Sequence, residues 1–116
     1  MENNPDAKLL RIFTGESDKA GQQPLYEAIV FEARKQGLSG ATVTRGIMGF
    51  GANSRVHTAK LFEISSDLPM VIEIVDSEAN IQAFLPTLNA MMGGGLLTME
   101  KVRVIDYRAG KTESKS

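Results

Sequence analysis

The apolar positions of the chain follow two different spacings, and together they predict a fold that mixes helices and strands. Alternating or continuous apolar runs predict strands at residues 8–13, 41–50, 60–64, 70–75 and 97–107. Pro69 cannot donate a hydrogen bond to a strand ladder and interrupts one of these stretches. The pattern therefore leaves open whether residues 59–75 form one bent strand or two.

A first helix is predicted where apolar residues recur every three to four positions, at Leu25, Ile29 and Ala33. Pro24 fits the first turn of this helix, where its missing N–H costs nothing, and Gly37 is placed to end it.

A second helix is predicted between the N-cap residue Ser77 and the glycines at 93–95. Its apolar residues continue at helical spacing from Ile81 to Met92. Pro86 lies inside this pattern, so we expect a kink or a division into two shorter helices.

The predicted element order is β-α-β-β-α-β, which is the order of the ferredoxin-like fold. The fold class is then α+β, a sandwich in which both helices cover one face of an antiparallel sheet. We expect one domain over residues 8–107, with disordered polar ends at 1–7 and 108–116.

The other face of such a sheet needs a cover of its own. We expect it to carry the apolar residues Ile12, Val43, Ile72, Ile74 and Val102, which are too many for a surface in water. A symmetric oligomer that packs its sheets together would bury them.

The composition narrows the functional classes. The chain has 116 residues, a formal net charge of −1 and no cysteine, so disulfides, thiolate metal sites and cysteine nucleophiles are excluded. The near-neutral charge argues against a nucleic-acid binder. The chain has neither an apolar run of about 20 residues nor the basic and apolar regions of a signal peptide at its start, and we expect a cytoplasmic protein.

The connection at residues 46–57 is too long for a simple hairpin, which needs about two to five residues. Gly49 and Gly51 are predicted to act as hinges in it, and Phe50 lies between them. Phe50 either stacks on a ligand or packs locally. Long loops on a rigid scaffold are frequent binding sites.

Arg45 and Arg55 flank or lie within this connection. The guanidinium group matches phosphate and carboxylate in a two-pronged geometry, so both arginines are candidate anion contacts. The alternative is that they form surface salt bridges with Glu63, Glu73 or Glu100.

The second candidate site is the turn Gly93-Gly94-Gly95, with Thr98 in the strand that follows. Successive backbone N–H groups of a glycine turn can surround an anion. The alternative is that Gly93 only caps the helix that precedes it.

His57 is the only histidine and is a candidate metal ligand or general base, although one histidine cannot form a typical zinc site within one chain. Ser54, His57 and Asp67 do not lie in a nucleophile-elbow pattern, so we do not expect an enzyme. Three acidic residues could hold a hard cation such as magnesium, and the favoured alternative is that they are solvated acidic residues: Glu16, Asp18 and Glu27.

Several short motifs in fixed order resemble one family over roughly residues 8–107, the PII-like domain of unknown function 190. These motifs stand at residues 14–18, 24–27, 40–43, 45–47, 49–51, 57–58, 67–69 and 95–98. The family is similar to PII signal-transduction proteins and CutA copper-tolerance proteins.

The resemblance implies a PII-like trimer of ferredoxin-like subunits. Such a trimer packs its sheets inward and binds nucleotides between subunits. Residues 49–57 would correspond to the long loop with which PII proteins contact a channel, transporter or enzyme, and 93–96 to their phosphate-binding turn. The acidic-lysine part of that turn is absent from this chain, as is a loop tyrosine for uridylylation.

The resulting prediction is a non-enzymatic homotrimer that binds an anionic small molecule, an adenine nucleotide by resemblance, and signals through the loop at 49–58. The alternative is a CutA-like trimer that responds to metal ions through His57. The predicted ligand-binding residues are Arg45, Gly49, Phe50, Gly51, Arg55, Gly93, Gly94, Gly95 and Thr98.

Overall fold

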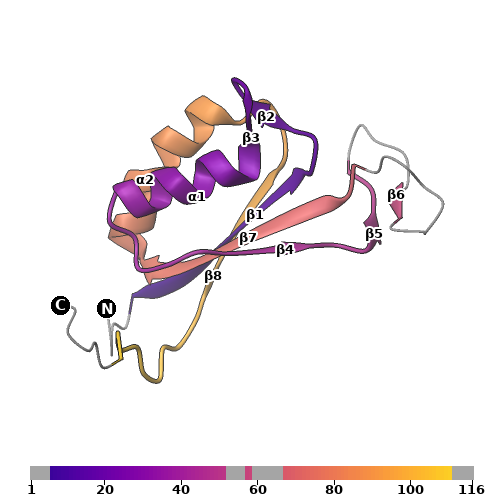
Figure 1. The fold of residues 1–116 in the computed structure, drawn as a ribbon. Helices are drawn as coiled ribbons and strands as arrows, with labels where there is room; N and C mark the ends of the chain where they lie inside the picture. Colours follow the sequence, from indigo (N-terminus) through magenta and orange to yellow (C-terminus); the bar gives the residue numbers. More distant parts are fainter. Residues whose placement is uncertain (1–5, 52–56, 59–66, 111–116) are drawn as a thin grey trace.

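The computed structural model describes residues 6–51, 57–58 and 67–110. Its elements follow one another along the chain as shown in Figure 1. They are β1 (Ala7–Gly15), β2 (Lys19–Ala20), β3 (Gln23–Pro24), α1 (Leu25–Lys35), β4 (Thr42–Arg45), β5 (Met48–Gly49), β6 (His57–Thr58), β7 (Pro69–Ser77), α2 (Glu78–Met91) and β8 (Leu96–Lys101).

The main sheet has the strand order β4-β7-β1-β8, and every neighbouring pair in it is antiparallel. This is the ferredoxin-like arrangement, so the predicted fold class is confirmed. The central strands β1 and β7 pair over nine positions, from Ala7 opposite Ser77 to Gly15 opposite Pro69. Two short hairpins lie outside the sheet, β2 with β3 and β5 with β6.

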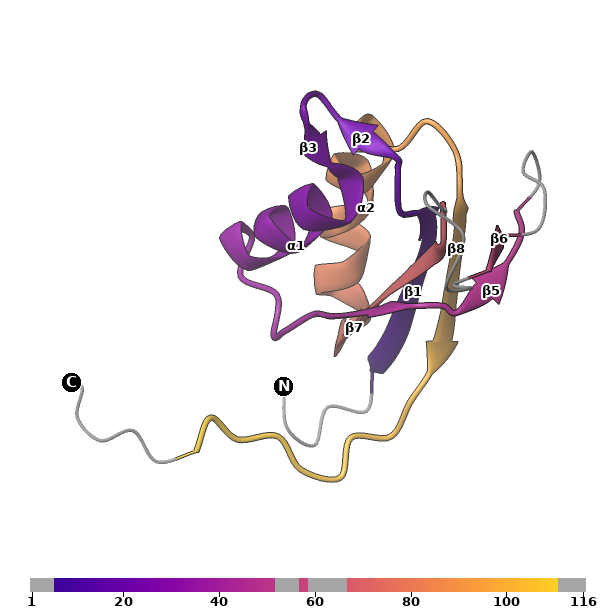
Figure 2. The ribbon, with the colours of Figure 1, turned by 45° about the vertical axis from the view of Figure 1, so that its right-hand side comes forward.

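Both helices cover the same face of the main sheet, as Figure 2 shows from the side. The core between them is apolar and comes from both layers: Leu10, Ile12, Leu25, Ile29, Ala33, Ile72, Ile74, Ile81, Phe84 and Leu88. Neither α1 nor α2, the two helices of the described residues, is long and apolar enough to span a membrane.

The predicted assignment of residues to the sheet faces was wrong. Ile12, Ile72 and Ile74 lie in the core beneath the helices, and Val43 packs against that core. The face away from the helices instead carries half-buried apolar residues of β1 and β7, which we call the open face: Leu9, Phe13, Val71 and Val75. Strand periodicity separates two faces but does not say which one the helices cover, because only packing decides that.

The helix ends follow the sequence closely. Ser77 caps α2, since its hydroxyl oxygen accepts a hydrogen bond from the backbone N–H of Asn80 at 3.2 Å. Gly37 has a φ of +84°, the left-handed conformation that ends α1. Pro86 was expected to cause either a kink or a division, and the division does not occur, because α2 runs unbroken past it.

Two predicted strands end earlier in the structure because the partner strand ends. The stretch 41–50 divides into β4 and β5, because β7, the partner of β4, starts at Pro69. The last hydrogen bond between them runs from the Gly46 N–H to the Pro69 oxygen at 2.7 Å. At the other end, β8 stops at Lys101 because its partner β1 begins at Ala7. The strand predicted at 60–64 lies outside the described residues.

Residues 102–110 have no regular structure, but two hydrogen bonds connect them to the domain. The Val102 N–H donates to the Ala7 oxygen at 3.3 Å, and the Tyr107 hydroxyl donates to the Ser39 oxygen at 2.6 Å. The predicted strand to residue 107 is therefore replaced by an extended segment that runs along the domain (Figure 2).

Candidate functional site

A cavity of about 870 Å³ is lined by residues from the end of β1, the start of β7 and the turn before β8. Figure 1 shows these three segments at the same end of the sheet. This volume is within the usual range of small-molecule sites, about 300–1,000 Å³. The lining residues come from six segments of the chain: Phe13, Thr14, Gly15, Asp18, Lys19, Leu25, Gly49, Phe50, Gly51, Asp67, Pro69, Gly93, Gly94, Gly95 and Leu96.

The cavity brings together the two glycine segments that the sequence singled out. Gly49, Phe50 and Gly51 of the connection line the cavity, and so do all three glycines of the turn at 93–95. These segments are more than 40 residues apart in the chain. Phe50 is 73% exposed, so it packs against little within the described part of this chain.

The other predicted site residues are not placed around this cavity by the structure. Arg45 forms a salt bridge with Glu16, and its Nη1 atom lies 3.0 Å from Glu16 Oε2. This is the surface salt bridge that the sequence offered as an alternative, but its partner is not one of the predicted glutamates. Thr98 pairs with Arg11 in the middle of β8. Arg55 lies outside the described residues.

Two glycines of the connection are required by close packing on Pro69. A Cβ atom built on Gly46 would lie 2.8 Å from Pro69 Cγ, and one on Gly49 would lie 2.9 Å from the same atom. Both distances are well below a normal van der Waals contact. Gly49 therefore allows the backbone to approach the start of β7, a role that the hinge interpretation did not include.

The turn at 93–95 does not have the geometry of the alternative in which Gly93 caps the helix. The C-cap of α2 is Met92, in an extended conformation, and its N–H donates to the Leu88 oxygen at 3.1 Å. Gly93 does not adopt a positive φ, whereas Gly95 does, at +125°. A Cβ atom on Gly93 or Gly94 would meet no other atom within 4 Å, so their backbone borders open space.

Most of the polar side chains around the cavity were not among the predicted ligand-binding residues. Lys19 is the one cationic residue among those lining it within the described chain, and it reaches this place through the β2–β3 hairpin. The carboxylates of Asp18 and Asp67 accept backbone hydrogen bonds, from the Gly15 N–H at 2.9 Å and the Ser17 N–H at 2.7 Å. No period or motif in the sequence indicated this hairpin, since residues 14–23 have the composition of a loop.

The loop after β1 is held in place by these carboxylates. The Asp67 oxygens lie so close to Gly15 that a Cβ atom there would be 2.7 Å from Oδ1. The Glu16 N–H also donates to the Leu68 oxygen at 2.8 Å. The acidic residues of the cavity therefore act as internal acceptors and shape the loop.

The described residues do not test the prediction that His57 binds a metal ion. The backbone of His57 pairs with Gly49 in the β5–β6 hairpin, but its side chain lies outside the description. Residues 6–51 and 67–110 contain no group of three or more His, Cys, Asp or Glu side chains that could hold a metal ion.

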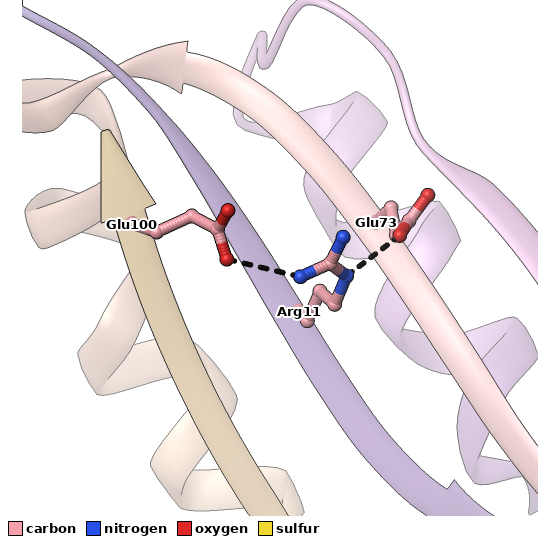
Figure 3. A network of polar contacts seen from close by, with 3 residues as sticks. All are labelled: Arg11, Glu73 and Glu100. Carbon is pink, nitrogen blue, oxygen red and sulfur yellow. Dashed lines mark hydrogen bonds and ion pairs between the residues drawn. The ribbon is translucent and has the colours of Figure 1, made fainter. Parts of the chain in front are cut away.

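A second polar feature occupies the centre of the open face (Figure 3). The Arg11 guanidinium lies between two carboxylates, with Nε 2.8 Å from Glu73 Oε2 and Nη1 3.0 Å from Glu100 Oε1. The hydrogen bond to Glu73 raises the pKa of Arg11 above its ordinary value, with the charge of Glu100 adding to it. Three adjacent strands, β7, β1 and β8, thus share one ion-pair network.

Comparison with known proteins identifies close relatives in sequence. The model of the DUF190 family, described as "Uncharacterized ACR, COG1993", matches residues 7–104. A UPF0166 protein of Aquifex aeolicus is 43% identical over 98 residues, which cover 84% of this chain and 92% of that protein. The UPF0166 protein MJ1524 of Methanocaldococcus jannaschii is 37% identical over 99 residues, covering 84% and 91%.

Solved structures with the same fold are more distant in sequence. A putative PII-like signalling protein of Thermus thermophilus, TTHA0516, has a TM-score of 0.61 at 20% identity, covering 85% of this chain and 89% of that chain. CPII of Thiomonas intermedia K12, bound to ADP and bicarbonate, has a TM-score of 0.58 at 18% identity, covering 86% and 89%. At these identities the likeness shows a common fold.

Proposed function

The chain belongs to the DUF190 family, and from this premise we propose that it is a non-enzymatic, PII-like regulator that binds an adenine nucleotide. The observation that carries the proposal is the cavity in which the two glycine segments meet, Gly49–Gly51 and Gly93–Gly95. CPII, which shares the fold, was solved with ADP bound.

The phosphate groups are assigned to the polar rim of the cavity. The backbone of Gly93 and Gly94 borders open space, where N–H groups can approach an anion without interference from side chains. Lys19 supplies the positive charge on the same cavity. This assignment replaces Arg45, which is engaged with Glu16, as the first cation of the site.

Signalling is assigned to the loop at 49–58. Its first residues line the cavity, and Ile47, Met48 and Phe50 expose most of their surface next to it. A ligand that contacts Phe50 and the adjacent glycines changes the free energy of this segment, which is the requirement for a ligand-driven change of shape. A partner protein would then recognise the conformation of the loop at 49–58.

We expect nucleotide binding to depend on Lys19. Thermal unfolding with ATP, ADP and AMP should show a shift for at least one nucleotide, since a ligand at a hundredfold excess over its Kd adds about 2.7 kcal/mol of stability. In calorimetry, Lys19→Gln should weaken that nucleotide about tenfold, because it removes the charge-assisted contact to phosphate.

The matched control is Lys35→Gln. Lys35 ends α1 and lies about 15 Å along the helix from Leu25, the α1 residue that lines the cavity. Its loss should leave nucleotide affinity unchanged. Wild-type protein that is folded and binds none of the three nucleotides would contradict the proposed function.

The proposal includes a homotrimer that packs the open faces inward. The open face carries Leu9, Phe13, Val71 and Val75 around the Arg11 network, and no described helix covers it. Burial of such an apolar surface favours association. The Arg11 guanidinium is already paired with two carboxylates within each chain, so that association buries it together with its partners.

A charge placed on the open face should dissociate the trimer. Val71→Glu puts a carboxylate on this face beside Phe13, and sedimentation equilibrium should then give the mass of one chain, where wild type gives three. Phe31→Glu is the control, because Phe31 is 59% exposed on α1 at the opposite side of the domain. If both variants keep the mass of the wild type, the open face is not the contact between subunits.

A further inference from the structure

One polar side-chain group at the cavity has no hydrogen-bond partner among the described residues. Thr14 is the second-last residue of β1 and lines the cavity, yet the residue is only 7% exposed. Its hydroxyl oxygen is buried and has no hydrogen-bond partner among the described residues. Buried hydroxyl groups are normally paired, so an unpaired one in a cavity wall points to a missing partner.

The polar groups of the loop beside Thr14 are engaged with other partners. The Gly15 N–H donates to the Asp18 carboxylate, and the Glu16 N–H donates to the Leu68 oxygen. The Asp67 carboxylate accepts from the Ser17 N–H. The loop therefore closes its hydrogen bonds without using the Thr14 hydroxyl.

Folding alone would not favour a hydroxyl group at this position. Thr14 lies on the face of β1 that packs beneath the helices, in line with Leu10 and Ile12, and pairs with the buried Met70 of β7. Valine has nearly the same shape and would bury a methyl group there without an unsatisfied polar atom. Rotation about the Cα–Cβ bond of Thr14 exchanges its methyl and hydroxyl groups between staggered positions, so a ligand in the cavity can recruit the hydroxyl.

We infer that Thr14 is a specificity-determining residue whose hydroxyl forms a hydrogen bond with the base of the bound nucleotide. The inference rests on the proposed function, since it needs a nucleotide in this cavity. The base is favoured over the phosphates because a charged group placed next to the buried end of β1 would lose its hydration. A neutral heteroaromatic ring with a polar edge suits an apolar surface, and Leu25 and Pro69 provide that surface in the same cavity.

The test compares Thr14→Val with Thr14→Ser in two measurements. In urea unfolding without ligand, Thr14→Val should have a midpoint at or above that of wild type, because it removes an unpaired hydroxyl. In calorimetry with the nucleotide that binds wild type most tightly, Thr14→Val should lose about tenfold in affinity, whereas Thr14→Ser should stay close to wild type.

A ligand without the base distinguishes the two ends of the nucleotide. Ribose 5-diphosphate should bind wild type and Thr14→Val equally, and unequal binding would assign the hydroxyl to the sugar or phosphates and overturn the inference. Equal affinity of wild type and Thr14→Val for the nucleotide would overturn the inference alone. A lower urea midpoint for Thr14→Val would also overturn it, since the hydroxyl would then have an internal partner. Failure of wild type to bind any nucleotide would remove the proposed function, and the inference with it.

Discussion

Replacing Gly95 by alanine is expected to destabilise the fold by about 2–4 kcal/mol, because both the backbone conformation and the space around this residue exclude a side chain. The φ of Gly95 is +125°, a conformation that residues with a Cβ atom rarely adopt. The added Cβ atom would also lie 2.6 Å from the Phe13 oxygen and 2.7 Å from Met92 Cε. The Met92 side chain can move, but the Phe13 backbone belongs to the central strand β1 and cannot.

Gly94→Ala is the matched control, one residue earlier in the same turn. Gly94 does not have a positive φ, and a Cβ atom there would meet nothing within 4 Å. We therefore expect a change of no more than about 1 kcal/mol. Urea unfolding followed by circular dichroism, at one fixed protein concentration, measures both variants. Equal losses of stability in the two would show that the turn does not need the observed conformation of Gly95.

The second large effect is expected at Asp76, a carboxylate that is only 2% exposed. It accepts three hydrogen bonds, from the Ser77 N–H at 2.7 Å, the Ser39 N–H at 2.8 Å and Asn80 Nδ2 at 2.9 Å. These bonds join the loop after α1, the end of β7 and the first turn of α2. Asp76→Ala leaves three donors without their acceptor, and we expect a loss of about 3 kcal/mol.

Asp106→Ala is the control for the loss of a carboxylate. Asp106 pairs with Arg108, two residues away in the extended C-terminal segment, and both side chains are exposed. Exposed pairs contribute about 0–1 kcal/mol, so this variant should remain close to wild type. A similar loss in both variants would mean that the three hydrogen bonds of Asp76 contribute little to folding.

The effect of Asp76 should also depend on pH. Burial by itself raises the pKa of this carboxyl, but the hydrogen bonds from Asn80, Ser77 and Ser39 outweigh it, so the folded-state pKa lies below the ordinary value. The contribution of Asp76 is then fully present above the unfolded-state pKa of about 4, and it is lost as the pH falls through the folded-state pKa. The stability difference between wild type and Asp76→Ala should be constant from neutral pH to about pH 5 and shrink below about pH 4.

Most of the fold was predictable because its signals are local. The spacing of Leu25, Ile29 and Ala33 identified α1, and Ser77 marked the start of α2 by its capping side chain. The order of the elements then led to the antiparallel sheet with two helices on one face, which the structure confirms. The strand ends at Arg45 and Lys101 were not predictable, because each is set by where a partner strand ends.

The candidate site was predictable in part. The glycines at 49, 51 and 93–95 stand out in the sequence, and all of them line the cavity. The polar residues did not stand out. Lys19 reaches the cavity only through the small hairpin β2–β3, and Arg45 pairs instead with a carboxylate 29 positions away.

By itself, the sequence determined the type and order of the elements, the two glycine segments and the family, since each depends on neighbouring residues or on motifs in fixed order. Only the tertiary structure decided that Ile12 and Ile72 face the helices and that Phe13 and Val71 face away from them. It alone also revealed that the buried hydroxyl of Thr14 has no partner in the part of the chain that the structure describes. The physical reason is that burial and hydrogen-bond satisfaction are properties of three-dimensional surroundings, and these are made by residues distant in the chain.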